Sequence, residues 1–153
     1  MSKNKTIESF GAKLRGALGD AIIAEAGDDF IAMCADDIVF QFPFSPAGSV
    51  TEIRGRDTLA RYLAKASNLI AFESFGSSVT HPSTDGETFI IEFSCKASGR
   101  ETGVRYDQNY IAVIRLKNGR IAQYRDYWNP LILLDAAGGI ECLKTTFEEF
   151  IDE

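Results

Sequence analysis

One acidic side chain, Asp126, lies in an aromatic and branched stretch near the end of the chain, YIAVIRLKNGRIAQYRDYWNPL (residues 110–131). Apolar, β-rich runs flank Asn118-Gly119, the pair that best supports a two-residue type I′ turn, so this stretch predicts a β-hairpin. A lone carboxylate in such surroundings is either a satisfied core polar group or an acid/base whose pKa is shifted by its environment. Any chemistry of this chain is therefore expected to involve Asp126.

The predicted turn also indicates which side chains share a face with Asp126. Counting outward from Asn118-Gly119 sets Ile111 opposite Asp126 and Asn109 opposite Trp128. Because side chains alternate between the two faces of a strand, one face is expected to combine the following residues: Asn109, Ile111, Val113, Tyr124, Asp126 and Trp128. Tyr124 and Trp128 would line a pocket or pack in the core. Asn109 would either bind a ligand carbonyl or fix the side chain of Asp126.

Further candidates come from earlier elements. Tyr62 lies on the apolar stripe of a predicted helix, where it would donate a hydrogen bond to an oxyanion or simply pack. Phe40 and Phe42, with Phe44, share one face of the first predicted strand and suit either a flat apolar ligand or the core. Glu92 interrupts the apolar strand FIIEF and is a second candidate acid. Strand alternation alone, however, turns Glu92 outward, toward Lys96.

Composition excludes several classes of function. The net charge of −6 and the absence of a basic cluster argue against a nucleic-acid surface. One histidine and three scattered cysteines cannot build a zinc site or a two-His-one-carboxylate iron site. The chain has neither a phosphate-binding P-loop nor a dinucleotide-binding glycine motif, so no cofactor is expected.

The location of the protein is also predicted from composition. The apolar runs are much shorter than the roughly 20 residues that span a bilayer, so no membrane segment is expected. The N-terminus lacks the long apolar core of a signal peptide. An odd number of widely spaced cysteines disfavours a disulfide framework. We therefore expect a reduced, cytoplasmic protein.

The order of predicted elements indicates an α+β fold in one domain over residues 1–153. A polar tail (1–6) precedes a helix with apolar residues at helical spacing up to Ile22, weakened by three glycines. A short helix (FIAMCA), a strand (DDIVFQFPFSP) and a third helix (TLARYLAKAS) follow. The rest is expected to form antiparallel strands, ending in an amphipathic C-terminal helix at 140–151. Helices followed by a run of long strands are typical of helices packed on one face of a sheet.

The face of the last hairpin opposite Asp126 is also apolar, with these residues: Tyr110, Ala112, Ile114, Leu116, Ile121 and Tyr127. Such a face is too apolar to be left in water. A partner subunit is the favoured cover, which predicts a homodimer through the outer sheet face. The alternative cover is the C-terminal helix of the same chain.

The chain resembles SnoaL-like proteins of the ketosteroid-isomerase and nuclear-transport-factor-two superfamily. The residues that carry this resemblance are Ala35-Asp36-Asp37-Ile38-Val39-Phe40, Arg54-Gly55-Arg56 and Gly119-Arg120-Ile121…Tyr124-Arg125-Asp126-Tyr127-Trp128. The run from Arg125 to Pro130, followed by Ala136-Ala137-Gly138-Gly139-Ile140, is most similar to phenazine-biosynthesis A/B proteins. The resemblance spans roughly residues 7–140. It implies a cone-shaped, strongly curved, mostly antiparallel sheet with helices across its concave face, an apolar cavity, and dimers through the outer sheet face.

The resemblance transfers only some of the family's chemistry. Asp126 matches the acid that phenazine proteins, polyketide cyclases and limonene-type epoxide hydrolases place on the last strand. Epoxide hydrolases also need an Arg and a second Asp on a neighbouring strand, and IIEFSCK supplies neither. Phenazine proteins carry a histidine where this chain has Tyr62. A tyrosine titrates near 10 when unperturbed and cannot replace that histidine as a proton shuttle at neutral pH.

Three functional hypotheses follow. The first is a cofactor-independent enzyme of the isomerase or cyclase type, in which Asp126 moves a proton next to the carbonyl of a flat, apolar polyketide-like or steroid-like compound. Tyr62 or Asn109 would then stabilise the enolate oxygen. The second is a dimeric binding module, or an accessory protein of a biosynthetic pathway, that uses the same cavity without turnover. The third, a protein-interaction scaffold, predicts a filled core.

Overall fold

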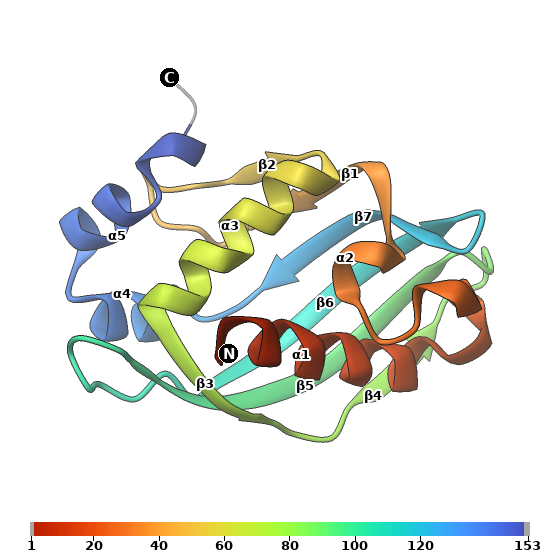
Figure 1. The fold of residues 1–153 in the computed structure, drawn as a ribbon, viewed down its shortest axis with the longest axis horizontal. Helices are drawn as coiled ribbons and strands as arrows, with labels where there is room; N and C mark the ends of the chain where they lie inside the picture. The colour runs from red at the N-terminus through yellow and green to blue at the C-terminus, as the bar shows by residue number, and fades with distance from the viewer. Residues whose placement is uncertain (1, 152–153) are drawn as a thin grey trace.

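The computed structural model describes the backbone of residues 2–151 and the side chains of residues 10–151. Over this part of the chain, seven strands form one curved, unclosed sheet, and helices lie across one face of it (Figure 1). The α+β class predicted from the sequence is therefore confirmed. No helix in the described part is long and apolar enough to cross a membrane.

The helices and strands of the described residues follow nearly the order that the sequence predicts. The helices are α1 (Ser2–Leu18), α2 (Phe30–Met33), α3 (Arg56–Leu69), α4 (Pro130–Ala137) and α5 (Ile140–Thr146), with a short 3-10 helix at Glu148–Phe150. The strands are β1 (Cys34–Gln41), β2 (Glu52–Arg54), β3 (Ile70–Phe75), β4 (Val79–Pro82), β5 (Thr88–Gly99), β6 (Gln108–Lys117) and β7 (Arg120–Tyr127).

The sheet is mostly antiparallel, as expected. Its strand order is β2-β1-β7-β6-β5-β3, and β1 pairs with β7 in parallel. The twelve-residue β5 is long enough to pair with two short strands in turn, β4 near its start and β3 near its end. The helices α1, α2 and α3 lie over the same face (Figure 1), so that face and the helices enclose the core.

The start of α1 and the length of α2 both differ from the prediction. Helix α1 begins at Ser2, within the range predicted as a polar tail, because no Gly or Pro interrupts residues 2–10; Met1 lies outside the described residues. Helix α2 is only one turn long. Asp29 caps it by accepting hydrogen bonds from the backbone N–H groups of Ile31 and Ala32, and the chain becomes extended at Cys34.

The C-terminal part contains a helix that the sequence analysis missed. Asn129 caps the N-terminus of helix α4, and Pro130 occupies its first position. Gly138 ends the helix in the left-handed region, with φ 89°. The expected single helix over 140–151 is also wrong. It breaks at Phe147, and a 3-10 turn follows it.

The hairpin register corrects the most consequential expectation. The turn at Asn118-Gly119 and the pairs Lys117–Arg120 and Leu116–Ile121 are as predicted, but the next pair is Arg115–Gln123. Strand β7 therefore contains one extra residue, Ala122, as a β-bulge. Beyond it every partner shifts by one, so Asp126 pairs with Ala112 and Tyr127 with Ile111.

This shift reverses the β6 face that accompanies Asp126. Tyr110, Ala112, Ile114 and Leu116 are buried on the inner side of the sheet, whereas Asn109 and Ile111 are exposed on the outer side. Because the first set faces the interior, the apolar outer face predicted from these residues is wrong. Neither a partner nor the C-terminal helix is needed to cover it.

Two glycines of α1 test how closely this helix packs against the segment 28–30. A methyl group on Gly11 would overlap the backbone carbonyl oxygen of Asp28, whereas Gly16 is exposed and has open space around it. Gly11→Ala is expected to lower the free energy of unfolding by about 2 kcal/mol because α1 must move off the 28–30 segment. Gly16→Ala should raise it by up to about 1 kcal/mol through helix propensity. Urea unfolding of both variants measures the difference; equal effects would contradict the close approach of α1.

Candidate functional site

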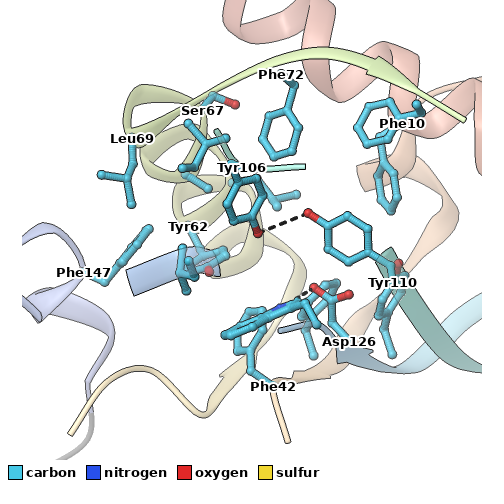
Figure 2. A pocket seen from close by; sticks show the side chains of 18 of the residues that line it. Phe10, Phe42, Tyr62, Ser67, Leu69, Phe72, Tyr106, Tyr110, Asp126 and Phe147 are labelled. Carbon is cyan, nitrogen blue, oxygen red and sulfur yellow. Dashed lines mark hydrogen bonds between the residues drawn. The ribbon is translucent and has the colours of Figure 1, made fainter. Parts of the chain in front are cut away.

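A cavity of about 130 Å³ lies between the inner face of the sheet and the helices α1 and α3 (Figure 2). Most of its lining side chains are aromatic, and they come from strands, helices and the C-terminal segment alike. Its polar groups are few: the carboxylate of Asp126 and the hydroxyls of Ser67 and of several tyrosines. The cavity contradicts the filled core that a pure scaffold predicts.

Asp126 forms part of the cavity wall, near the end of β7. The indole N–H of Trp128 donates a hydrogen bond to Asp126 Oδ2 at 3.1 Å (Figure 2). The ion pairs found among the described residues do not include Asp126. Burial raises the pKa of Asp126 to about 7, and the hydrogen bond from Trp128 opposes this rise only in part. Near neutral pH Asp126 can therefore both take up and release a proton.

The position of Trp128 is fixed by the chain that follows it. The side chain of Gln108, which is buried, donates from Nε2 to the Asn129 carbonyl (2.9 Å) and accepts from the Asn129 N–H (3.0 Å). Asn129 in turn caps α4. This clamp directs the chain from β7 into α4 and holds Trp128 against Asp126.

Two tyrosine hydroxyls meet above Asp126. The Tyr110 hydroxyl donates to the Tyr106 hydroxyl at 3.2 Å, and both point into the cavity (Figure 2). A phenol that accepts one hydrogen bond still has its own proton to donate. Burial raises the pKa of Tyr62, Tyr106 and Tyr110 above the ordinary value, and the nearby charge of Asp126 adds to this effect. These hydroxyls therefore stay protonated and act as donors.

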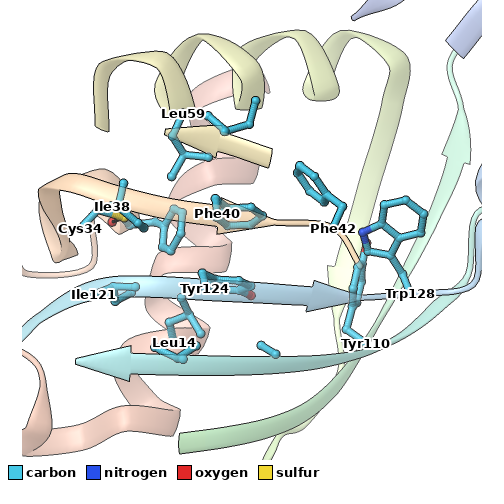
Figure 3. Close-up of a cluster of buried hydrophobic side chains, with 14 of the residues drawn as sticks. Leu14, Cys34, Ile38, Phe40, Phe42, Leu59, Tyr110, Ile121, Tyr124 and Trp128 are labelled. Atoms are coloured by element: carbon cyan, nitrogen blue, oxygen red, sulfur yellow. Dashed lines mark hydrogen bonds between the residues drawn. The ribbon is translucent and has the colours of Figure 1, made fainter. Parts of the chain in front are cut away.

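Stacked rings form the wall next to Asp126. Phe40 lies nearly parallel to Tyr124, with ring centroids 4.4 Å apart and an angle of 13°. Phe42 lies between Tyr62 (5.2 Å) and Trp128 (6.0 Å). Figure 3 shows that this wall continues into the buried core at Ile38, Leu59 and Ile121. Core packing thus holds the rings that line the cavity.

Six of the eight predicted site residues meet in this cavity: Phe40, Phe42, Tyr62, Tyr124, Asp126 and Trp128. Their roles in binding or catalysis remain predictions. Phe44 does not join Phe40 and Phe42. The strand ends before Pro43, and Phe44 is exposed and packs against Tyr127 instead.

Asn109 and Glu92 lie on the opposite face of the sheet. The expected place of Asn109 beside Asp126 is therefore wrong, whereas the outward orientation that strand alternation predicts for Glu92 is confirmed. Asn109 faces outward by the regular alternation of β6, and the Ala122 bulge turns Asp126 to the other side. Glu92 follows the plain alternation of β5; it is exposed, and its Oε2 lies 2.7 Å from Nε2 of His81 rather than beside Lys96.

Tyr106 and Tyr110 line the cavity but are not among the site residues predicted from the sequence. A signal was present, because Tyr106, Gln108, Tyr110 and Ala112 alternate with more polar residues and so share one side. That side was assigned to the outer surface. Within the described residues, no group of three His, Cys, Asp or Glu side chains could hold a metal ion.

The raised pKa of Asp126 predicts a pH-dependent stability difference. Between the ordinary value of 3.8 and about 7, the folded protein retains a proton that the unfolded chain releases, so the wild type loses stability as pH rises through this range. Asp126→Asn cannot titrate and should not show this loss. Relative to the wild type, the variant is expected to gain on the order of 4 kcal/mol between pH 4 and pH 8. Urea unfolding at several pH values measures this; parallel pH profiles would show that Asp126 is charged and well solvated.

Comparison with known proteins agrees with this fold. The model of the SnoaL-like domain matches residues 17–124, a segment that ends two residues before Asp126. The uncharacterised Bacillus subtilis protein YesE is 41% identical over 104 residues, which cover 68% of this chain and 71% of YesE. An uncharacterised PhzA/B-like protein of Pseudomonas aeruginosa is 33% identical over 103 residues, covering 67% and 72%.

A solved structure from Bacillus subtilis, described as a candidate isomerase, shares 33% identity and superimposes with a TM-score of 0.71. The superposition covers 92% of this chain and 98% of that one. The resemblance inferred from the sequence is thereby confirmed at the level of family and fold. The chain belongs to the SnoaL-like domain family.

Proposed function

We propose that this protein binds a small apolar, cyclic carbonyl compound in the cavity and catalyses a cofactor-independent proton transfer of the isomerase or cyclase type. The observation that carries this proposal is a carboxylate without an ion-pair partner among the described residues, set in an aromatic cavity and with its pKa raised to about 7. Such a value suits a group that must gain and lose a proton near neutral pH.

In the proposed reaction, the Asp126 carboxylate removes a proton from the carbon next to the carbonyl. The products of this step are the carboxylic acid of Asp126 and an enolate. Asp126 then returns the proton to the same carbon or to a conjugated one, which completes an isomerisation without a cofactor. The C–H bond broken in the first step is thus replaced by a C–H bond in the last.

The enolate oxygen would be stabilised by the tyrosine hydroxyls. Tyr106, whose oxygen already accepts from Tyr110, has its proton available, and Tyr62 supplies a second donor in the same cavity. Donors placed in a low-dielectric site stabilise a developing negative charge strongly. Asn109, the other donor considered from the sequence, is on the outer face and has no part in this step.

The alternative function is a binding module that holds the same ligand without turnover. Asp126 would then orient the ligand through its carboxyl group. The two functions share the cavity and differ only in whether a proton leaves the ligand.

Hydrogen–deuterium exchange separates these functions. With cyclohexanone in D2O, the wild type is expected to accelerate exchange next to the carbonyl, and the rate should rise with pH through about 7 as Asp126 ionises. Asp126→Asn should lower the protein-dependent rate by about 10²–10⁴-fold, the usual contribution of a general base. NMR follows the exchange after subtraction of the buffer rate.

Glu92→Gln makes the same kind of change on the outer face and should leave the exchange rate unaltered. Protein-independent exchange, together with binding of cyclohexanone, would sink the enzyme proposal in favour of the binding module.

We further propose that the protein forms a homodimer through its outer sheet face. A row of paired residues crosses this face from β4 to β7: Val79, Glu92, Ile111 and Tyr127. Val79 and Ile111 are large apolar side chains that are exposed. Exposed apolar side chains on a broad sheet face suit a self-complementary contact between two copies.

Ile111→Arg tests the dimer, because a charge at the centre of a self-complementary contact faces its own copy. The variant is expected to sediment as a monomer where the wild type sediments as a dimer. Val104→Arg is the matched control, since Val104 is 41% exposed and Ile111 is 46% exposed, but Val104 precedes β6 and lies outside the row. A monomeric wild type, or equal effects of the two variants, would exclude this interface.

A further inference from the structure

The C-terminal segment closes one end of the cavity. Phe147, at the end of α5, is buried and lines the cavity. Its ring stacks on Tyr62, with centroids 4.9 Å apart and an angle of 29° (Figure 2). A ligand that extends past Tyr62 in this direction therefore meets the phenyl ring of Phe147.

The position of Phe147 is held by contacts that the next residues of the chain make with α3. Glu149 forms ion pairs with Arg61 (2.6 Å) and Lys65 (3.1 Å) on α3. The ring of Phe150 packs edge-on against Tyr62, and the Arg61 guanidinium lies over it. The segment is thus fixed to the same helix that carries Tyr62, which makes Phe147 a firm boundary.

The cavity that this boundary leaves is small. Its volume of about 130 Å³ is close to that of an engineered apolar cavity of about 150 Å³ in another protein, which binds benzene. The space therefore matches a ligand of one ring. Two fused rings that lie wholly inside the cavity would need Phe147 to move or the core to expand.

The cavity is also unsuited to anions. None of its lining residues is a Lys, Arg or His, and its one ionisable acid is Asp126. A carboxylate on the ligand would lose its hydration without gaining a partner, and it would face a like charge.

We propose that Phe147 sets the size limit of the site, and that its substrate is a one-ring carbonyl compound without an anionic group. This inference rests on the proposed function for the carbonyl, but the size limit concerns binding alone. Phe147 lies beyond residues 17–124, the segment that matches the family model. The limit is thus a feature of this chain's C-terminal segment.

The single tryptophan gives a direct measurement of binding. Trp128 is the only tryptophan of the chain and lines the cavity, so a change in its fluorescence reports a ligand in this site. Three probes separate size from charge: cyclohexanone (one ring), 1-decalone (two fused rings) and cyclohexanecarboxylate (one ring, anionic). The wild type is expected to bind cyclohexanone about tenfold more tightly than 1-decalone, because the larger probe overpacks the cavity. Cyclohexanecarboxylate should not bind.

Phe147→Ala removes the ring at the boundary and should reverse the order, so that 1-decalone binds more tightly than cyclohexanone. Phe147→Leu, a milder change, should narrow the difference. Phe150→Ala is the matched control, because Phe150 contacts the same Tyr62 but does not line the cavity; it should keep the wild-type order. An unchanged order in Phe147→Ala, a reversal in Phe150→Ala, or tight binding of cyclohexanecarboxylate would overturn the proposal.

Failure of this inference is distinguishable from failure of the proposed function. Probe binding involves no proton transfer, and the order of probes should be the same in Asp126→Asn as in the wild type. A size-selective cavity without hydrogen exchange would reject the proposed enzyme and keep the role of Phe147. Hydrogen exchange without size selection would keep the proposed enzyme and reject the role of Phe147.

Discussion

The chemistry of this site depends on one extra residue in the β6–β7 ladder. Ala122 has no partner of its own, so β7 changes register beyond it and Asp126 pairs with Ala112. Without the bulge, the β6 face beside Asp126 would carry Asn109 and Ile111 instead of Tyr110 and Ala112. The bulge therefore determines that the carboxylate meets tyrosine hydroxyls in the cavity instead of lying on the outer side with Ile111.

Once Asp126 faces inward, its environment follows from desolvation. A carboxylate among aromatic rings is stabilised as the neutral acid, and here the Trp128 N–H is the hydrogen bond that favours the charged form. The Gln108–Asn129 clamp maintains that bond by fixing the chain after β7. The same clamp starts α4, which leads to α5 and to Phe147. The acid, its hydrogen-bond donor and the closed end of the cavity thus belong to one continuous piece of chain.

Much of this could be predicted from local patterns. Helical spacing in α3 placed Tyr62 inward, and strand alternation placed Phe40 and Phe42 together, because both depend only on the period of one element. The Asn118-Gly119 turn and the role of Asp29 as a cap also follow from short sequence signals. The predictions that failed assumed that a strand stays regular past a β-bulge or past the end of its pairing. Asn109 was predicted to face Asp126 from a hairpin register that the bulge changes. Phe44 was predicted to join Phe40 and Phe42 on a strand that in fact ends before Pro43.

The sequence by itself determined the fold class, the family and the identity of the central acid. It could do so because apolar periodicity, turn residues and motif order are local properties of the chain. Only the tertiary structure decided which side chains surround that acid. The bulge at Ala122 turns Tyr124, Asp126 and Trp128 toward the interior, and their burial depends on the rest of the fold. Only the tertiary structure, likewise, brought Tyr106, Tyr110 and Phe147 to the same cavity. Contacts between residues so far apart in the chain depend on how the sheet curves and how the C-terminal segment packs against α3.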